Sequence, residues 1–454
     1  MPTDRPATTD TTLPDRGLPS GADPARRPAV AEALSPLIVQ FLGEHAPVRF
    51  VFWDGSDIGP HAPGGPEVPA VVRVRSVDAV RHILWAPGEL GLARAFVSGD
   101  IDVDGDIVAA LKAMTVSSVR DRARFDLRRL PPVWRGARQV GALRRPPPPP
   151  LEEARPRGRR HSPARDAQAV RHHYDVGNAF YEIVLGPSMT YSCARFAERG
   201  TTLEEAQWAK HELICRKLGL HTAPGARLLD VGCGWGSMAL HAARHHGATV
   251  VAVTLSEAQA DYARKRVAEA GLADRIEVRM QDYRDLRGER FEAISSVGMF
   301  EHVGASQMDR YFSTLHALLT PEGRLLNHAI SSVGGSAVSG RSFVGRYVFP
   351  DGELQDVGSV VLAMERAGFE VRDVESLREH YARTLRAWVA NLENRWAEAV
   401  ELVGVRRARV WRLYMAASAV GFDDGGIGIH QVLGVVPTAA GTSGMPPTRH
   451  GWTF

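Results

Sequence analysis

The spacing of apolar positions first indicates a small mixed unit near the start of the chain. Over residues 31–45 apolar side chains recur at helical spacing, whereas 48–53 and 70–74 are β-rich runs with an Asp-Gly turn signal between them. A second short helix is expected near 107–114. We therefore predict a compact α+β unit over residues 31–118, whose pattern alone indicates no chemistry.

A longer region, residues 167–434, alternates strand and helix patterns. Amphipathic stretches at 237–246 and 257–270 are expected to form helices between short apolar runs. The predicted strands are 228–231, 249–255, 275–280, 293–297 and 324–329. This order predicts an α/β fold with a doubly wound, mostly parallel sheet.

Three other segments lack such patterns. Residues 1–30 are rich in Pro, Thr, Asp and Arg and have no apolar h-region, so a disordered leader is expected and not a secretory signal. Residues 119–166 include five consecutive prolines, Pro146–Pro150, which prevent a continuous helix and favour a spacer between domains. Residues 435–454 are rich in Gly, Pro, Thr and Ser and are expected to form a loose tail.

Charge and cysteine content narrow the possible partners and compartment. The net charge of +3 argues against a polyanion-binding protein, but the segment from Arg120 to Arg160 holds thirteen arginines against four acids. That run is either a solvated linker or a contact for anionic lipid headgroups, worth roughly 1 kcal/mol per basic residue. Three cysteines form no disulfide framework, which favours the cytoplasm, and Cys215 is expected in a helix core. We predict no metal ion.

A glycine-rich turn provides the first chemical signal. The first strand of the large domain runs into Asp230-Val231-Gly232-Cys233-Gly234-Trp235-Gly236. The third glycine comes one residue too early for the dinucleotide-binding fingerprint. A carboxylate directly before the loop suits an ammonium group better than a pyrophosphate. The loop therefore favours S-adenosylmethionine, and the following strand ends at Thr254 and Asp282 are placed to contact it.

At this point the chain resembles the cyclopropane-fatty-acyl-phospholipid synthases and their mycolic-acid relatives. The matching motifs include His173-Tyr174-Asp175-Val176-Gly177-Asn178, Met189-Thr190-Tyr191-Ser192-Cys193-Ala194, the Asp230 loop and Gln281-Asp282-Tyr283-Arg284-Asp285. Later motifs are Ser296–Gly304, Tyr347–Gly352 and His380–Leu385. The resemblance covers about residues 170–433. It implies a Rossmann-like, class I S-adenosylmethionine-dependent methyltransferase domain with a smaller N-terminal domain.

The resemblance also implies roles for individual residues. Together with Asp230, the implied cofactor contacts are Tyr191, Ser192, Gly232, Gly234, Thr254, Leu255, Gln259, Asp282 and Val297. The family holds a bicarbonate ion beside the reactive methyl group, and its ligands correspond to Cys193, Glu301, His328, Tyr381 and the backbone of Ile330. A carboxyl group next to an anion requires a shared proton. Phe180, Tyr181 and Phe300 are candidates for stabilising positive charge on the substrate.

The leading hypothesis is methyl transfer to the double bond of an unsaturated phospholipid acyl chain, followed by deprotonation and ring closure with bicarbonate as base. The same site is also compatible with a methylene-branched product, because both products need an electrophilic methyl and a base. A methyltransferase for a soluble metabolite and a catalytically silent lipid-binding protein remain weaker alternatives. Nucleic acid is not an expected partner. We expect peripheral association with the inner face of the membrane, and the family resemblance allows a homodimer.

Overall fold

The structure is a computed structural model that describes residues 29–43, 48–60, 70–120, 130–154, 176–337, 342–349 and 352–452. The predicted leader, the arginines of 155–160 and the His173-Tyr174-Asp175 motif lie outside these residues. No helix in the described ranges is both long enough and apolar enough to cross a membrane.

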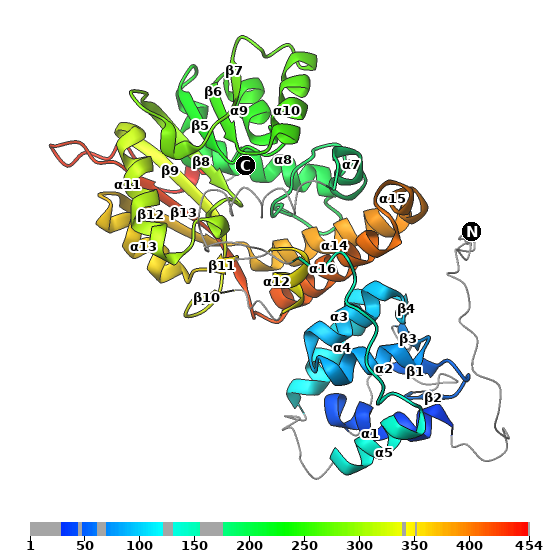
Figure 1. Cartoon of the computed structure of the whole chain (residues 1–454). Coiled ribbons are helices and arrows are strands. Elements are labelled where there is room, and N and C mark those ends of the chain that lie inside the picture. The colour runs from blue at the N-terminus through cyan, green and yellow to red at the C-terminus, as the bar shows by residue number, and fades with distance from the viewer. Residues whose placement is uncertain are drawn as a thin grey trace.

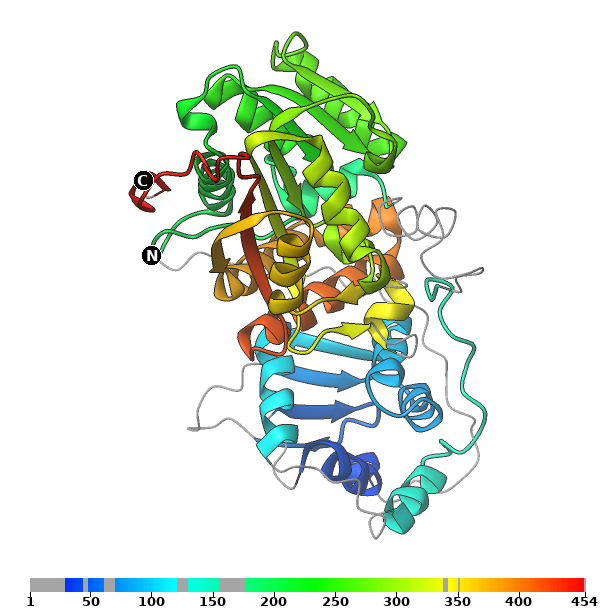
Figure 2. The same ribbon diagram turned by 90° about the vertical axis from the view of Figure 1, so that its left-hand side faces the viewer.

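The N-terminal unit is a four-stranded sheet flanked by helices, and it lies below the larger domain in Figures 1 and 2. Its elements are α1 (Val30–Leu42), β1 (Arg49–Phe52), β2 (Asp57–Ile58), β3 (Ala70–Val74), α2 (Val77–Trp85), α3 (Glu89–Ser98), β4 (Ile101–Gly105), α4 (Ile107–Arg120) and α5 (Leu130–Gln139). The strand order is β2-β1-β3-β4, with only β1 and β3 parallel. The predicted α+β character of this unit is therefore present.

The larger domain is built on a seven-stranded sheet in the order β12-β13-β9-β8-β5-β6-β7. All pairs are parallel except those made by β13, which is antiparallel to both neighbours. The strands are β5 (Arg227–Val231), β6 (Thr249–Thr254), β7 (Ile276–Met280), β8 (Phe291–Val297), β9 (Leu319–Ser331), β12 (Glu370–Ser376) and β13 (Gly428–Val435), and a small hairpin pairs β10 (Ser336–Ala337) with β11 (Glu353–Leu354). The prediction of a doubly wound, mostly parallel sheet is confirmed.

Ten helices in the described part of the chain accompany this sheet. They are α7 (Asn178–Leu185), α8 (Leu203–Leu218), α9 (Ser237–His246), α10 (Glu257–Glu269), α11 (Met308–Leu318), α12 (Phe343–Tyr347), α13 (Val357–Arg366), α14 (Arg378–Asn394), α15 (Trp396–Val403) and α16 (Val405–Asp423). Helices α8, α9 and α10 cover one face of the sheet, while α11 and α13 cover the other (Figure 1). Alternate strand residues enter two cores: Leu228 packs with α8, α9 and α10, whereas Leu229 packs with α11 and α13. The parallel strands are thus buried on both sides, which explains their continuous apolar runs.

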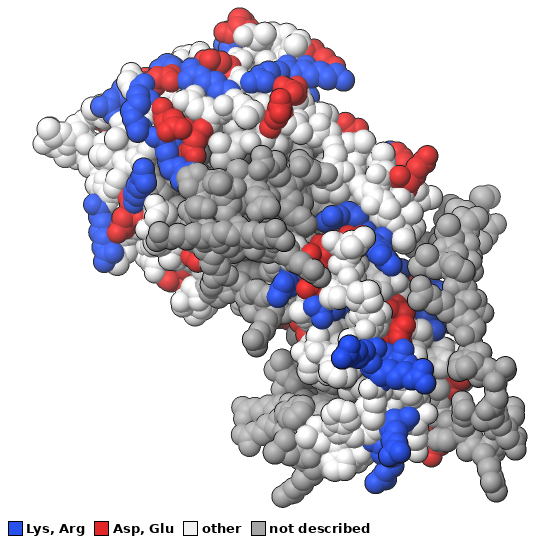
Figure 3. Space-filling model, in the orientation of Figure 1, with Lys and Arg blue, Asp and Glu red and all other residues white. Residues whose placement is uncertain are grey.

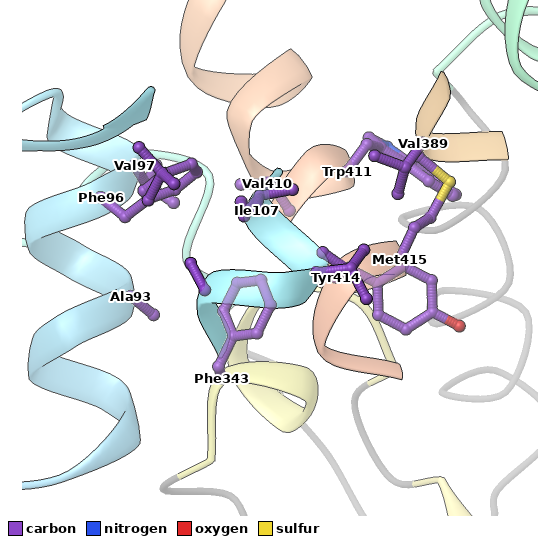
Figure 4. Close-up of a cluster of buried hydrophobic side chains, with 14 of the residues drawn as sticks. Ala93, Phe96, Val97, Ile107, Phe343, Val389, Val410, Trp411, Tyr414 and Met415 are labelled. Atoms are coloured by element: carbon purple, nitrogen blue, oxygen red, sulfur yellow. The ribbon is translucent and has the colours of Figure 1, made fainter. Parts of the chain in front are cut away.

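Helices α14, α15 and α16 come between β12 and β13 in the chain and join the two units. Figure 4 shows Val410 and Trp411 of α16 in one apolar cluster with Phe96 of α3 and Ile107 of α4. Buried Arg409 donates hydrogen bonds to the carbonyl oxygens of Phe96 and Ile101, at 2.7 and 2.6 Å. The N-terminal unit and the catalytic domain therefore share one core.

The described part of the predicted spacer differs from the expectation of a simple linker. Residues 130–139 form α5, which packs against α1. The close approach depends on Gly136, where an added Cβ would lie 1.8 Å from the carbonyl oxygen of Ala33. Further on, buried Glu153 accepts two hydrogen bonds from Arg94, at 2.8 and 2.9 Å. Much of this segment is thus part of the N-terminal unit.

The end of the chain also differs from the expected loose tail. After β13 it runs back along the catalytic domain and ends in a short 3-10 helix, His450–Trp452. Trp452 is only 7% exposed and joins the core beneath α8 and α9. Arg324 donates to the carbonyl oxygen of Gly444 at 2.8 Å, and Arg449 pairs with Asp373 at 3.0 Å. One buried indole and a few polar contacts hold a segment whose composition suggested disorder.

Candidate active site

The glycine loop joins β5 to α9 at the carboxyl edge of the sheet. Gly232, Gly234 and Gly236 all have positive φ, at 75°, 54° and 82°. Gly232 is also sterically required, because a Cβ there would lie 2.8 Å from the Met299 side chain. Its N–H donates to the carbonyl oxygen of Val253 at 2.9 Å, which fixes the loop to the neighbouring strand. The loop therefore opens space for a ligand at the switch point of the sheet.

One cavity lies against this loop, and all ten residues predicted to bind the cofactor line it. They are Tyr191, Ser192, Asp230, Gly232, Gly234, Thr254, Leu255, Gln259, Asp282 and Val297. Thr254 donates to the Gln259 side chain at 2.9 Å, so the end of β6 and the first turn of α10 form one wall. Asp282 is held by Arg284, which keeps the pKa of that carboxyl below its usual range despite partial burial.

Asp230 is the only fully buried carboxyl group among the described residues that line this cavity. One oxygen accepts a hydrogen bond from Ser295 at 2.8 Å, whereas the other has no hydrogen-bond partner within the described ranges. Burial raises its pKa to about 6, although the hydroxyl of Ser295 and the charge of Lys210 oppose that rise. A buried carboxylate with an unused oxygen is suited to an ammonium group, which is the role that the sequence assigns to Asp230.

Glu301 lies in a 3-10 turn, Phe300–His302, just beyond β8. Its Oε1 accepts the N–H of Ile330 at 2.8 Å, while buried Oε2 has no partner in the part of the chain that the structure describes. Burial raises the pKa of the Glu301 carboxyl to about 7, and the bond from Ile330 limits that rise. The group therefore exchanges a proton near neutral pH, as a general base or acid must.

The other three candidates of the implied anion site are Cys193, His328 and Tyr381, all buried. Burial raises the pKa of the Cys193 thiol and lowers that of His328 well below its usual range, so both are neutral. Neither ring nitrogen of His328 has a partner among the described residues. Cys193 contacts the carbonyl oxygen of Leu377, one turn before Tyr381 on α14.

None of these five residues is on the wall of the cofactor cavity itself. They are next to it along the chain or the sheet: Cys193 follows Ser192, and His328 pairs in register with Val297. Met299 and His302, on either side of Glu301, line the cavity as well. The structure thus brings Glu301 and Ile330 into direct contact and places Cys193 and His328 next to residues that line the cavity, whereas Tyr381 packs against Trp388 and Phe422.

Aromatic rings surround Tyr191, but they are not all the ones that the sequence suggested. The ring centroid of Tyr181 lies 5.7 Å from that of Tyr191, and the ring centroid of Phe180 lies 6.1 Å from that of Tyr181. Phe300, in contrast, packs in another core with Tyr311 and is not part of the group. Trp388 and Trp411 complete it, at 5.3 and 6.0 Å from Tyr191.

Lys210 of α8 is a cavity residue that sequence reasoning missed. Its side chain is 1% exposed. Its Nζ donates to the Ser192 hydroxyl at 2.9 Å and lies 3.0 Å from His211 Nε2. Burial lowers its pKa to about 7. A neutral or easily neutralised amine is compatible with a cationic ligand nearby, whereas a permanent charge would repel it. Helical periodicity shows only that Lys210 lies on α8, because its cavity partners are distant in sequence.

Comparison with known proteins shows what the chain is similar to. A model of the family described as mycolic acid cyclopropane synthetase matches residues 161–432. A probable fatty acid methyltransferase of Mycobacterium tuberculosis is 43% identical over 431 residues, 92% of this chain and 97% of that protein. The cyclopropane-fatty-acyl-phospholipid synthase of Escherichia coli K12 is 37% identical over 263 residues, 58% of this chain and 66% of that protein.

Among solved structures, a mycolic acid cyclopropane synthase complexed with SAH and CTAB is similar. The TM-score is 0.55 at 33% sequence identity, and the match covers 59% of this chain and 97% of the other. The predicted fold, a class I S-adenosylmethionine-dependent methyltransferase domain, is therefore confirmed.

Proposed function

Because the chain belongs to the mycolic acid cyclopropane synthetase family and is an S-adenosylmethionine-dependent methyltransferase of fatty acid modification, we propose that it converts a double bond in an unsaturated phospholipid acyl chain into a cyclopropane ring. The observation that carries this proposal is the buried carboxyl group of Glu301, with its pKa near 7 and one free oxygen. Ring closure requires removal of a proton from the carbon of the added methyl group, and a buried carboxyl group beside the cofactor cavity is suited to assist that step.

S-adenosylmethionine supplies a methyl group attached to a sulfonium, which is electrophilic enough for an alkene to attack. The residues of this chain bind and orient it. Asp230 would hold its ammonium group, the glycine loop would let the backbone come close, and Thr254 with Gln259 would form part of the wall. The pairing of a buried carboxylate with a cation in a cavity partly closed to water strengthens the attraction.

The alkene electrons form the new carbon–carbon bond as the carbon–sulfur bond breaks. The ring closes when the added methyl group loses a proton and its C–H electrons form the third side. Glu301 is the residue proposed to accept or relay that proton. Its buried position also keeps water away from the cationic chain, which would otherwise give an alcohol.

Bicarbonate as the proton acceptor is compatible with these side chains, provided that Glu301 carries a proton. Neutral Cys193 and His328 are hydrogen-bond donors for an anion, and the pKa of Glu301 near 7 allows it to hold a proton toward the same anion. The Ile330 N–H already donates to Glu301, so it serves an anion only by sharing that bond. We therefore propose a bicarbonate site made by side chains, with Ile330 acting mainly through Glu301.

Approach to the membrane is proposed to use the N-terminal unit. On the face in Figure 3, basic side chains are prominent on this unit, whereas acidic and basic groups are mixed over the catalytic domain. Helix α5 exposes Trp134, at 54%, beside Arg135 and Arg138, and Arg144 and Arg145 follow it. An exposed indole among arginines is suited to an anionic lipid interface.

The chemical structure of the product distinguishes cyclopropane formation from methylene branching. Unsaturated phospholipid vesicles are incubated with enzyme and S-adenosylmethionine carrying a trideuterated methyl, and the acyl chains are analysed by mass spectrometry before and after ozonolysis. A product that retains two deuteriums and resists ozone is the ring that we propose. Cleavage to a ketone with loss of label identifies a methylene branch instead, and no labelled lipid at all contradicts the lipid substrate.

The role of Glu301 is tested with Glu301→Gln. The amide keeps an oxygen for the Ile330 N–H but cannot take up a proton, so turnover should fall at least a hundredfold while S-adenosylmethionine binding is retained. The matched control is Glu269→Gln, an exposed position on α10 that should leave turnover unchanged. Full activity of the Glu301→Gln enzyme contradicts the assignment.

A further inference from the structure

A second group of reactive side chains lies between α8 and α9, apart from the residues discussed above. Glu212 and Cys215 are three positions apart on α8 and therefore share a helix face. His241 and His246 come from the last two turns of α9, which packs against α8. The thiol of Cys215 and a ring nitrogen from each histidine all lie within 4.8 Å of one another.

Glu212 completes this arrangement. Its Oε2 is 3.3 Å from His241 Nε2 and 2.9 Å from His246 Nε2. A tetrahedral zinc site with bonds of about 2.0–2.3 Å has ligand atoms roughly 3.3–3.6 Å apart. The distance from Glu212 Oε2 to His241 Nε2 already matches an edge of such a tetrahedron, and the distance to His246 Nε2 is a few tenths of an ångström shorter. The Cys215 sulfur lies within 4.8 Å of a ring nitrogen of each histidine, so it would move closer to them when an ion binds.

We propose that these side chains form a binding site for a divalent transition-metal ion, with zinc favoured, and that its four ligands are Glu212, Cys215, His241 and His246. One thiolate, two imidazoles and one carboxylate are donors that zinc accepts readily. A thiolate and a carboxylate carry two negative charges, which a divalent ion neutralises. The ion therefore compensates the charge of both anionic ligands, which favours their burial.

Arg216 supplies an outer contact of the kind that orients a metal ligand. Its Nε donates to Glu212 Oε1 at 2.6 Å, which leaves Oε2 directed at the two histidines. Such contacts fix the ligating oxygen before the ion arrives.

A bound ion would connect the two helices that flank the cofactor cavity. Helix α8 carries Lys210 and His211 on the cavity wall, and the first turn of α9 contributes Ser237 and Met238. The site is outside the cavity, so its role is structural: it stabilises the frame in which S-adenosylmethionine binds. The proposal stands independently of the acyl substrate and product.

The test uses the full chain without a histidine tag. The protein is incubated with Zn²⁺, dialysed against metal-free buffer and analysed for metal by mass spectrometry. We expect about one zinc per chain and a higher melting temperature than after chelation. Cys215→Ala and His246→Gln should lose the retained zinc. His245→Gln is the matched control, because His245 is exposed beside the cluster on α9 and should keep it.

Substitution with Co²⁺ provides a second measurement that does not depend on the folding of the variants. In the wild-type protein, Co²⁺ should give the visible bands of a tetrahedral site and a thiolate-to-metal charge-transfer band. Retention of no zinc by the wild-type protein, or a cobalt spectrum without the thiolate band, overturns the proposal. Calorimetric binding of S-adenosylmethionine distinguishes this failure from failure of the methyltransferase function.

Discussion

Binding of S-adenosylmethionine should depend on the ionisation of Asp230. The cation requires the carboxylate, and burial raises the pKa of Asp230 to about 6 in the ligand-free protein. The ionised fraction is then about ten elevenths at pH 7 and about one eleventh at pH 5. Because apparent affinity scales with the competent fraction, the dissociation constant should increase about tenfold over that range.

Two variants make this prediction specific. Asp230→Asn keeps an oxygen for Ser295 but removes the charge, so affinity at pH 7 should fall about 30-fold, equivalent to about 2 kcal/mol. The part of the pH dependence that is due to Asp230 should disappear, and only the part that is due to Lys210 should remain. Ser295→Ala keeps the carboxylate and removes a hydrogen bond that lowers its pKa, so the midpoint should move to higher pH. The assay is isothermal titration calorimetry between pH 5 and 7.

A wild-type dissociation constant that stays constant between pH 5 and 7 would refute the role of Asp230. The same conclusion follows if Asp230→Asn retains the pH dependence of the wild type. If only Ser295→Ala fails to shift the midpoint, the role of the Asp230 carboxylate still holds. The error then lies in the effect assigned to the Ser295 hydrogen bond on the pKa of Asp230.

Three further predictions concern the rest of the molecule. Trp452→Ala should lower the free energy of unfolding by about 3 kcal/mol in urea titrations, because the indole is buried, and no change would mean that the end of the chain is loose in solution. Arg409→Ala should cost about 3–5 kcal/mol by leaving buried carbonyl oxygens unsatisfied, whereas exposed Arg406→Ala should cost little; equal effects would contradict this account. Replacing Trp134 by Ala and Arg135 by Ser together should weaken co-sedimentation with anionic liposomes, and undiminished binding would exclude this face.

The sheet was predictable because its strands are buried on both faces and its ligand loop has a distinctive spacing. Leu228–Val231 and the glycines after it were therefore located correctly from sequence. The helices from 378 to 423 were not identified, although they form the bridge to the N-terminal unit. Their apolar positions face two different partners, so no single helical stripe identifies them.

The site was predictable as a set of residue types but not as a geometry. Tyr191 and Asp230 lie on the cavity as expected, yet Lys210 also lines it, and Trp388 packs against Tyr191 from a distant part of the chain. Phe300 and Tyr181 were both candidates for stabilising positive charge but lie in different cores, because a position in the chain after β8 does not reveal which face of the sheet a side chain enters. The composition of residues 435–454 likewise concealed one buried tryptophan.

The core shared by α3, α4 and α16 has a consequence for synthesis of the protein on the ribosome. Arg409 contacts the carbonyl oxygen of Phe96 across 313 positions of sequence. At a synthesis rate of about 5–20 residues per second, Arg409 is added to the chain roughly 15–60 s after Phe96. During that interval the apolar faces of α3 and α4 are accessible to chaperones and to other nascent chains. Slow translation or premature termination should therefore expose this protein to aggregation even when all its catalytic residues have been made.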